Sequence, residues 1–464
     1  MNKEAILGRT VTGRLKLFFT FFDSRWEDLN KKNWKTNMYS DFSAGLIVAL
    51  TAIPLAMGFA IAMGMRPEQG IIAGALACVV GRTFGGSKYQ VYGPTAALIP
   101  IIAALNYKYG VASGGTAAQA HGVLVFVSII AGIILLLLGI FGIGKYAKLI
   151  PNSIIIGFTF GIAVTIALSN SADILGIKSF KEFLGANEDI HANMIHKIYL
   201  SMGNLHIINW WSVLIGVLTF AVTKILLRIS VLIPGPIIAM AIATLLSATI
   251  FADKGIILVK DIYGSIPNNF FVFTGPSLPA MSMGLMGDII YFVIAIVFVS
   301  GIESILCSTM ADKMAENTRT PFNPNKELWG QGWVQIIIPL VNGFPCTGAL
   351  ARTATSIKAG AKTPLAGYFK AVLKLTLAYY LAQYLELIPM ACIGGILVWV
   401  ASNMIKPYEI IEVKKEGQFE FLMMVYTAIM VPATDFFTGV LSALVIYYVL
   451  KYIYHKTRKH RAVA

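Results

Sequence analysis

Two ionisable side chains stand inside strongly apolar stretches of the sequence. Glu303 lies about two-thirds of the way along an apolar segment near 286–310, and Arg352 follows Thr347 by five residues in a shorter segment. Ionisable residues within membrane segments are rare and mark ion pathways, substrate sites or paired charges. We therefore treat both residues as candidates for a functional site. The alternative interpretation is a structural ion pair between them, which would lie beside the same site.

Two short segments share a pattern that interrupts a helix. Residues 89–94 (YQVYGP) alternate like a strand and end in a Gly-Pro pair, and residues 343–346 (GFPC) play the same part later. Each is followed by a similar quartet, TAAL at 95–98 and TGAL at 347–350. Short segments interrupted by Gly or Pro at corresponding positions of two halves indicate a transporter binding site.

The start of such a half-helix favours a negatively charged ligand. A helix that begins in mid-membrane leaves its first backbone N–H groups unpaired, and we expect Thr95 and Thr347 to cap some of them. Two converging N-termini also present partial positive charges of about half a unit each. Ala96, Gly348 and Ala349 are small enough to let a ligand approach the backbone. The pattern predicts an anion site; the alternative is that the small residues serve only tight helix packing.

The composition indicates that a lipid bilayer surrounds most of the chain. Hydrophobic residues make up 57% of it and charged residues 13%, against roughly 45–50% and 25% in soluble domains. Apolar stretches long enough to cross a hydrocarbon layer of roughly 30 Å recur almost from end to end. We therefore expect a multi-pass protein of the cell membrane.

Apolar windows bounded by Gly, Pro or charged residues predict two sets of seven spans. The first set is expected near 41–63, 67–84, 94–106, 119–141, 151–172, 209–227 and 231–251, and the second near 286–310, 327–342, 347–358, 364–384, 388–405, 418–433 and 434–454. Because seven is odd, the second set enters the membrane with the opposite orientation to the first. The predicted fold class is an all-α membrane protein of about 14 transmembrane helices in a 7+7 inverted repeat, with half-helices at positions 3 and 10.

Basic residues beside these spans define the expected topology. The net charge of +14 lies in membrane-flanking loops and at both ends of the chain, so it does not indicate a nucleic-acid partner. Basic loops face the cytoplasm, and both termini are therefore expected inside. We divide the chain into a cytoplasmic segment 1–40, a transmembrane transporter domain 41–454 with repeats 41–251 and 286–454, and a short basic cytoplasmic tail 455–464.

Other chemistries find little support in the sequence. The four cysteines stand singly in apolar segments, without the CxxC spacing of a zinc site or the pattern of a disulfide framework. The sequence also has no nucleophile–base motif, Walker sequence or metal cluster. We expect neither an enzyme nor a bound cofactor or metal.

Four further stretches have distinctive sequences. They are DFSAGL at 41–46 with IPLAMGFA at 53–60, FGGS at 84–87 with GPT at 93–95, GIES at 301–304 with AD at 311–312, and the highly specific TGALARTAT at 347–355 with GAKTPLAG at 360–367. Together they resemble the sulfate permease (SulP) family of anion transporters over nearly the whole chain. Family members usually carry a cytoplasmic STAS domain after the last helix, and because this chain ends at Ala464 we expect none here.

The resemblance implies a core domain that moves against a gate domain, a homodimer, and a small anion held between the third and tenth helices. The residues that would line the site come from the first, third and tenth helices. They are Leu55, Phe59, Thr95, Ala96, Gly348, Ala349, Leu350, Ala351 and Arg352. Many relatives have Gln at the position of Leu55, so one polar contact to the substrate is missing in this chain.

The same resemblance bears on the coupling ion, which is a proton or sodium. Sodium-coupled bicarbonate members have Asp at the position of Glu303 and hydroxyl ligands at the positions of Cys307 and Leu350. Both hydroxyls are absent here, and sodium favours oxygen ligands, by the reasoning used for other hard cations. We therefore expect proton coupling through Glu303, with Cys307 beside it, because a membrane carboxyl can bind and release a proton near neutral pH.

Several functions stay open at this point. The leading prediction is a secondary active anion symporter of the sulfate, bicarbonate or dicarboxylate class. The alternatives are a sodium-coupled bicarbonate symporter and an uncoupled anion exchanger or channel, which needs no proton carrier. A nucleobase permease has similar repeats but would place carboxylates, rather than an Arg, where a base could bind.

Overall fold

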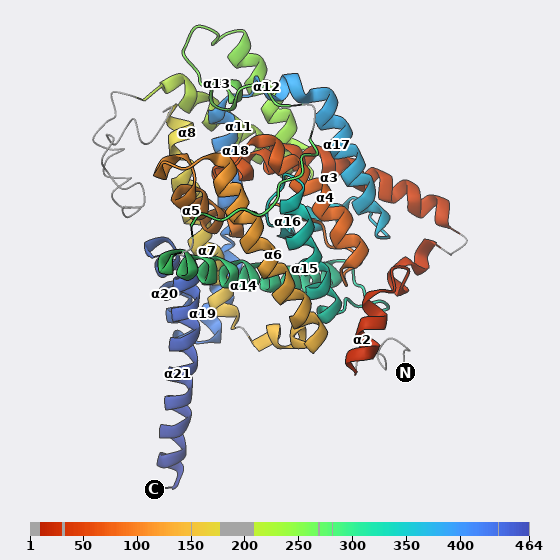
Figure 1. Ribbon diagram of the computed structural model, residues 1–464, viewed down its shortest axis with the longest axis vertical. Coiled ribbons are helices and arrows are strands. Elements are labelled where there is room, and N and C mark those ends of the chain that lie inside the picture. The colour runs from red at the N-terminus through yellow and green to blue at the C-terminus, as the bar shows by residue number, and fades with distance from the viewer. Residues whose placement is uncertain are drawn as a thin grey trace.

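The computed structural model describes residues 10–29, 33–149, 151–176, 208–267, 270–280, 282–434 and 436–463. It is mainly helical (Figure 1), because in a bilayer the backbone polar groups must be satisfied within the chain. The elements before residue 280 are α2 (Val11–Phe18), η1 (Ser24–Leu29), α3 (Trp34–Ala62), α4 (Pro67–Phe84), β1 (Tyr92–Gly93), η2 (Ala96–Leu98), α5 (Ile99–Tyr109), η3 (Val111–Ser113), α6 (Ala117–Phe141), η4 (Ile143–Leu149), α7 (Asn152–Ser169), α8 (Ser171–Leu175), α11 (Trp210–Ile229), α12 (Gly235–Ala248) and α13 (Val259–Tyr263). Those after it are α14 (Met283–Met314), α15 (Pro324–Leu340), β2 (Thr347–Gly348), α16 (Leu350–Lys358), α17 (Leu365–Leu385), α18 (Met390–Met404), α19 (Pro407–Glu416), α20 (Gln418–Ala433) and α21 (Phe436–Val463).

Each predicted span overlaps a helix, although some boundaries differ. α3 begins at Trp34 rather than at 41. The span predicted from 94 contains the 3-10 helix η2 before α5 begins at Ile99, and the span predicted from 347 begins with the strand β2 before α16. Within the described ranges, six helices are long and apolar enough to cross a membrane, and three shorter apolar helices accompany them. The number of crossings therefore stays a prediction.

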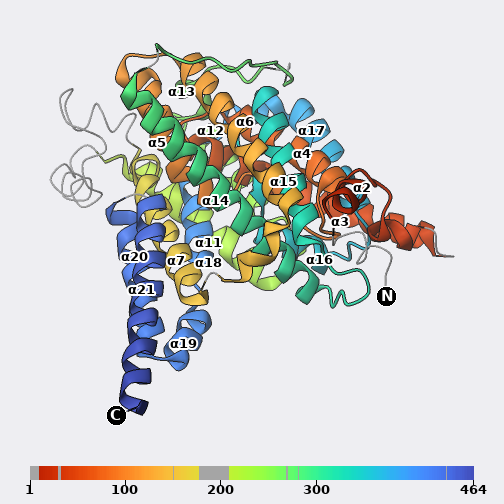
Figure 2. The ribbon, with the colours of Figure 1, turned by 60° about the horizontal axis from the view of Figure 1, so that its bottom comes forward.

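Helices at equivalent positions of the two predicted sets make equivalent contacts. α4 packs against α17 as α15 packs against α6, and α3 packs against α17 as α14 packs against α6. In the same way α7 packs against α20, and α18 packs against α11. Figure 2 shows α7, α19, α20 and α21 gathered on one side of the molecule and α4, α15, α16 and α17 on the other.

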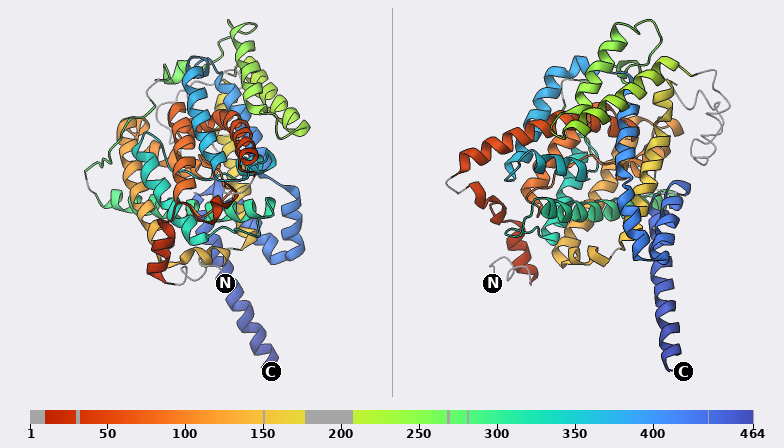
Figure 3. Two further views of the ribbon diagram at one scale, coloured as in Figure 1. Left: turned by 90° about the vertical axis from the view of Figure 1, so that its right-hand side faces the viewer. Right: turned by 180° about the vertical axis from the view of Figure 1, so that it is seen from behind.

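Small residues bring these helices close together. A Cβ atom on Gly70 of α4 would lie 2.0 Å from the Ala56 oxygen of α3, and one on Gly395 of α18 would lie 2.4 Å from the Gly216 oxygen of α11. Such contacts are typical of helix packing in membranes, where van der Waals contact replaces the hydrophobic driving force. The C-terminal helix α21 projects well beyond the other described helices (Figure 3).

Candidate functional site

The two interrupted segments meet as a short antiparallel pair. Tyr92 of β1 pairs with Gly348 of β2, and Gly93 pairs with Thr347. The Ala349 N–H extends the pairing by donating to the Val91 oxygen at 2.9 Å. Extended backbone at membrane depth is tolerated only when its polar groups find partners in the protein. Each interrupted segment supplies those partners for the other, and we refer to this pair as the β1–β2 crossing.

The two helix starts lack the predicted threonine caps. Thr95 precedes η2, but its side chain makes no capping bond. Thr347 lies within β2, and its hydroxyl donates to the Ser300 oxygen at 3.2 Å, while Ala349 occupies the N-cap of α16. The prediction that both threonines cap was wrong, because their hydroxyls are used in contacts with α14 and because α16 begins three residues later than expected. Neither η2 nor α16 therefore has a side-chain cap on its first backbone N–H groups.

Arg352 of α16 reaches across to the other segment. Its side chain is buried, with 4% exposed, and its Nη2 donates to the Pro94 oxygen. Its Nη1 is buried and has no hydrogen-bond partner in the described structure. Gly93 has φ +156°, and a Cβ there would lie 2.9 Å from Nη1. Arg352 therefore brings a cation with one free donor to the β1–β2 crossing.

Glu303 of α14 contacts Thr95, which directly follows Pro94, the residue that Arg352 contacts. Its Oε2 accepts a hydrogen bond from the Thr95 hydroxyl at 2.9 Å. No salt bridge joins Glu303 to Arg352 among the residues that the structure describes. The structural ion pair is therefore not formed. The carboxylate and the guanidinium instead contact consecutive residues of the first segment.

Cys307 packs against the crossing rather than standing free. Its Sγ lies 3.4 Å from the Thr353 hydroxyl, which in turn accepts a hydrogen bond from the Val91 N–H at 2.9 Å. A Cβ on Gly348 would lie 2.9 Å from the Cys307 Cβ and 2.6 Å from the Gln90 side chain. Cys307 and Thr353 thus hold the two segments together, and Gly348 is the residue type that fits between them.

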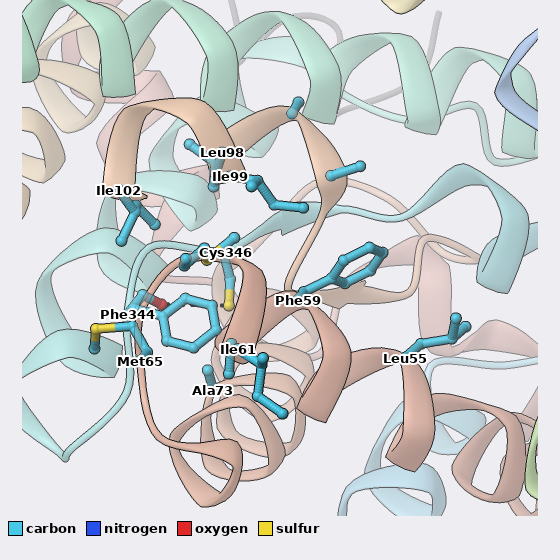
Figure 4. Packing of buried hydrophobic residues seen from close by; sticks show 14 of the residues in the cluster. Leu55, Phe59, Ile61, Met65, Ala73, Leu98, Ile99, Ile102, Phe344 and Cys346 are labelled. Atoms are coloured by element: carbon cyan, nitrogen blue, oxygen red, sulfur yellow. Dashed lines mark hydrogen bonds between the residues drawn. The ribbon is translucent and has the colours of Figure 1, made fainter. Parts of the chain in front are cut away.

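The apolar residues predicted to line the site lie on α3. Leu55 and Phe59 are one turn apart on α3, and Phe59 lies between Leu55 and the region of Leu98 and Ile99, where η2 meets α5 (Figure 4). Leu55, Phe59 and Ala96 belong to one buried cluster. On α16, Ala349 is buried, Leu350 is half-buried and Ala351 is exposed.

A polar stripe on α15, which the sequence analysis overlooked, supports the crossing from behind. Glu327, Gln331 and Gln335 follow one another at intervals of four residues, which places them on one helix face. The fully buried Glu327 carboxylate accepts bonds from the N–H groups of Gly86 and Ser87 and from the side chains of Gln90, Tyr92 and Ser304. Gln335 donates to the Cys346 oxygen at 2.8 Å, and Gln331 donates to the same atom. The four-residue spacing is the signal that could have revealed them.

Two lysines of α17 were also overlooked. Lys370 donates to the oxygens of Gly74 at 3.0 Å and Tyr92 at 2.9 Å, and Lys374 donates to the Gly70 oxygen at 3.4 Å. Both are buried.

A cavity of about 590 Å³ lies elsewhere, at the C-terminal end of α14, and none of the predicted site residues lines it.

Fold and site together describe a helical membrane protein whose two interrupted segments meet beside a buried cation. Residues 38–427 match the model of the sulfate permease family. The chain is 32% identical to YvdB of Bacillus subtilis (strain 168), over 92% of this chain and 75% of that protein. It is 26% identical to the bicarbonate transporter BicA of Picosynechococcus sp., over 80% of this chain and 62% of that protein.

Solved structures agree on the fold. The transmembrane domain of a cyanobacterium bicarbonate transporter BicA superposes with a TM-score of 0.73 at 22% identity, covering 88% of this chain and 97% of that one. A structure of SLC26A9 gives 0.77 at 17% identity, covering 93% and 67%. The chain belongs to the sulfate permease family of anion transporters. It is a multi-pass integral membrane protein, and the known relatives are transporters rather than enzymes.

Proposed function

We propose that this chain is a secondary active transporter of small inorganic or organic anions of the sulfate, bicarbonate or dicarboxylate class, coupled to protons. One observation carries the proposal. The buried Arg352 Nη1 lies at the β1–β2 crossing with no hydrogen-bond partner among the residues that the structure describes, and an unpaired buried donor on a cation is unfavourable until a ligand accepts from it. An anion between the two helix starts would accept from Arg352 and from the uncapped backbone N–H groups.

The predicted site residues have distinct roles in this proposal. Thr95 and Ala96 stand at the start of η2, Gly348 and Ala349 lead into α16, and Leu55, Phe59, Leu350 and Ala351 bound the anion with apolar surface. The small side chains matter because a larger one would keep the anion from the backbone.

The proposed transport cycle rests on the paired contacts of the two halves. The equivalent packing of α4 with α17 and of α15 with α6 supports a 7+7 inverted repeat with repeats 41–251 and 286–454. In such a repeat, one bundle moves as a body against the other around a fixed site. We assign the helices around the crossing to a core domain and α7, α11, α12, α18, α20 and α21 to a gate domain. We further propose a homodimer in the cell membrane with both termini in the cytoplasm.

Glu303 is the proposed proton carrier. It lies beside the anion site, bonded to Thr95. Protonation would remove one negative charge as the anion adds its own, so that the loaded core exposes less net charge to lipid. Cys307 presents a sulfur atom, and sulfur is a poorer ligand for sodium than oxygen.

A sodium-coupled bicarbonate symporter is the second candidate. The hydroxyl of Thr95 on Glu303 and that of Thr353 beside Cys307 place oxygen atoms near the proposed coupling residue. Oxygen atoms are the ligands that sodium prefers. The likeness to bicarbonate transporters adds to this candidate.

Uptake into proteoliposomes tests the proposal and separates the candidates. Labelled sulfate, bicarbonate and fumarate would each be supplied with an inward proton gradient, an inward sodium gradient or no gradient. We expect uphill uptake of at least one anion with the proton gradient and none without it. Uptake driven by sodium alone would favour the second candidate. Equilibration that no gradient drives uphill would indicate an uncoupled exchanger or channel.

A further inference from the structure

Two lysines of α17, Lys370 and Lys374, lie at the β1–β2 crossing in addition to Arg352. Arg352 contacts the Pro94 oxygen, and Lys370 contacts the Tyr92 oxygen at 2.9 Å. Lys374 lies against the same turn of chain, since a Cβ on Gly74 would be 2.3 Å from its Nζ and 3.2 Å from the Pro94 Cδ. Three cations from α16 and α17 therefore converge on residues 92–94.

The two lysines have carbonyl partners but no carboxylate partner. Lys370 is 1% exposed and Lys374 is fully buried. No salt bridge involves either of them within the described ranges. Among the described residues, Lys374 donates one hydrogen bond, of 3.4 Å, to the Gly70 oxygen. Buried cations usually have an anionic partner, because carbonyl groups repay only part of the lost hydration.

The other charges around the crossing do not neutralise this cluster. Glu303 is bonded to Thr95, and the Glu327 carboxylate is bonded to the Tyr92 hydroxyl. Arg82 is also buried and donates to the Tyr89 oxygen, so it adds a further cation near the crossing. Within the described ranges, Arg352, Lys370 and Lys374 are thus three buried cations at the crossing without a salt-bridged carboxylate, and the Glu303 carboxylate is bonded to the neighbouring Thr95.

We infer that Lys370 and Lys374 determine the charge selectivity of the anion site and make it favour divalent over monovalent anions. This inference rests on the proposed function, and it adds two residues outside the predicted site that would set which anions bind. Each fixed cation attracts a dianion twice as strongly as a monoanion at the same position. Two lysines behind the crossing add this preference without touching the ligand.

The twofold stronger attraction of a dianion predicts how much affinity each anion loses when a lysine is neutralised. If neutralising one lysine weakens binding of a monovalent oxyanion by a given factor, it weakens binding of a divalent oxyanion by about the square of that factor. A fivefold loss for nitrate would accompany a loss of about 25-fold for sulfate. A lysine with a purely structural role would weaken both anions by the same factor.

The test measures nitrate and sulfate affinity of the purified full chain by calorimetry. Lys374→Met is the principal variant, because Lys374 donates to one backbone oxygen where Lys370 donates to two, and Lys370→Met is the second. Lys362→Met is the matched control, since Lys362 is exposed just before the same helix. Succinate, measured beside sulfate, shows whether the preference extends to organic dianions. Thermal unfolding reports whether each variant is folded.

The inference predicts that wild type binds sulfate more tightly than nitrate, and that Lys374→Met loses sulfate affinity by the square of its nitrate loss while Lys362→Met changes neither. Equal losses for the two anions, or no loss, would overturn it. If neither lysine variant folds, tighter binding of nitrate than of sulfate by wild type would still overturn it. Wild type that binds none of nitrate, sulfate, bicarbonate and succinate would contradict the proposed function itself, a separate result.

Discussion

Replacing Arg352 by Met should weaken anion binding, while the Met side chain still fills most of the volume that the arginine occupied. Arg352→Met keeps an apolar stem of similar length and removes both the Pro94 contact and the free Nη1. A hydrogen bond to a charged group contributes about 1.5–3 kcal/mol, so the loss of the Nη1 contact should weaken binding by about 10- to 150-fold. Arg352→Lys keeps the charge but not the forked donor geometry and should fall between.

Affinity, rather than stability, is the quantity to measure for this variant. The substitution leaves the buried Pro94 oxygen without its donor, which destabilises, and also removes a buried charge, which stabilises. Calorimetry on folded Arg352→Met, Arg352→Lys and the exposed control Arg228→Met separates binding from these opposing effects. An unchanged dissociation constant in Arg352→Met would refute the reasoning and remove Arg352 from the site.

Three further perturbations test the supporting structure and the topology. Glu327→Leu should lower the unfolding temperature and abolish transport, because the N–H groups of Gly86 and Ser87 lose their acceptor; transport at the wild-type rate would contradict this role. Asp23 has its pKa held below 3.8 by Arg25 and Lys326, although burial opposes this. A lowered pKa stabilises the folded state above 3.8 and loses this effect as pH falls through the folded value. The difference in unfolding temperature between wild type and Asp23→Asn should therefore be constant from about pH 8 to about pH 5, and a difference that vanishes by pH 5 would be inconsistent with it. A reporter cysteine at Lys406 should not react with an impermeant reagent in intact cells; labelling there would reverse the proposed orientation.

Hydropathy was sufficient to predict most of the helices. α6 and α14 are continuous apolar helices, and each is long enough to cross a hydrocarbon layer of roughly 30 Å. The Gly-Pro pair at 93–94 and the GFPC stretch likewise predicted where helices could not begin. These features depend on local sequence, which is why they could be inferred.

The rest depended on contacts between distant segments. The pairing of Tyr92 with Gly348 involves strands of two residues, too short to carry a sequence signal. The cap prediction for Thr95 and Thr347 failed because both hydroxyls bond to α14 instead. Glu327 fell at the edge of a predicted span, where an acidic residue is ordinary, and its burial is evident only once β1 is packed against α15.

The central claim is that Glu303 couples anion movement to protons, and one measurement tests it most directly. Proteoliposomes containing wild type or Glu303→Gln would be compared for uphill anion uptake at acidic outside pH, with and without sodium, and for anion exchange without a gradient. Glu303→Gln keeps Arg352 and the helix starts, so we expect it to retain exchange and to lose proton-driven accumulation. Undiminished proton-driven accumulation by Glu303→Gln would contradict the account.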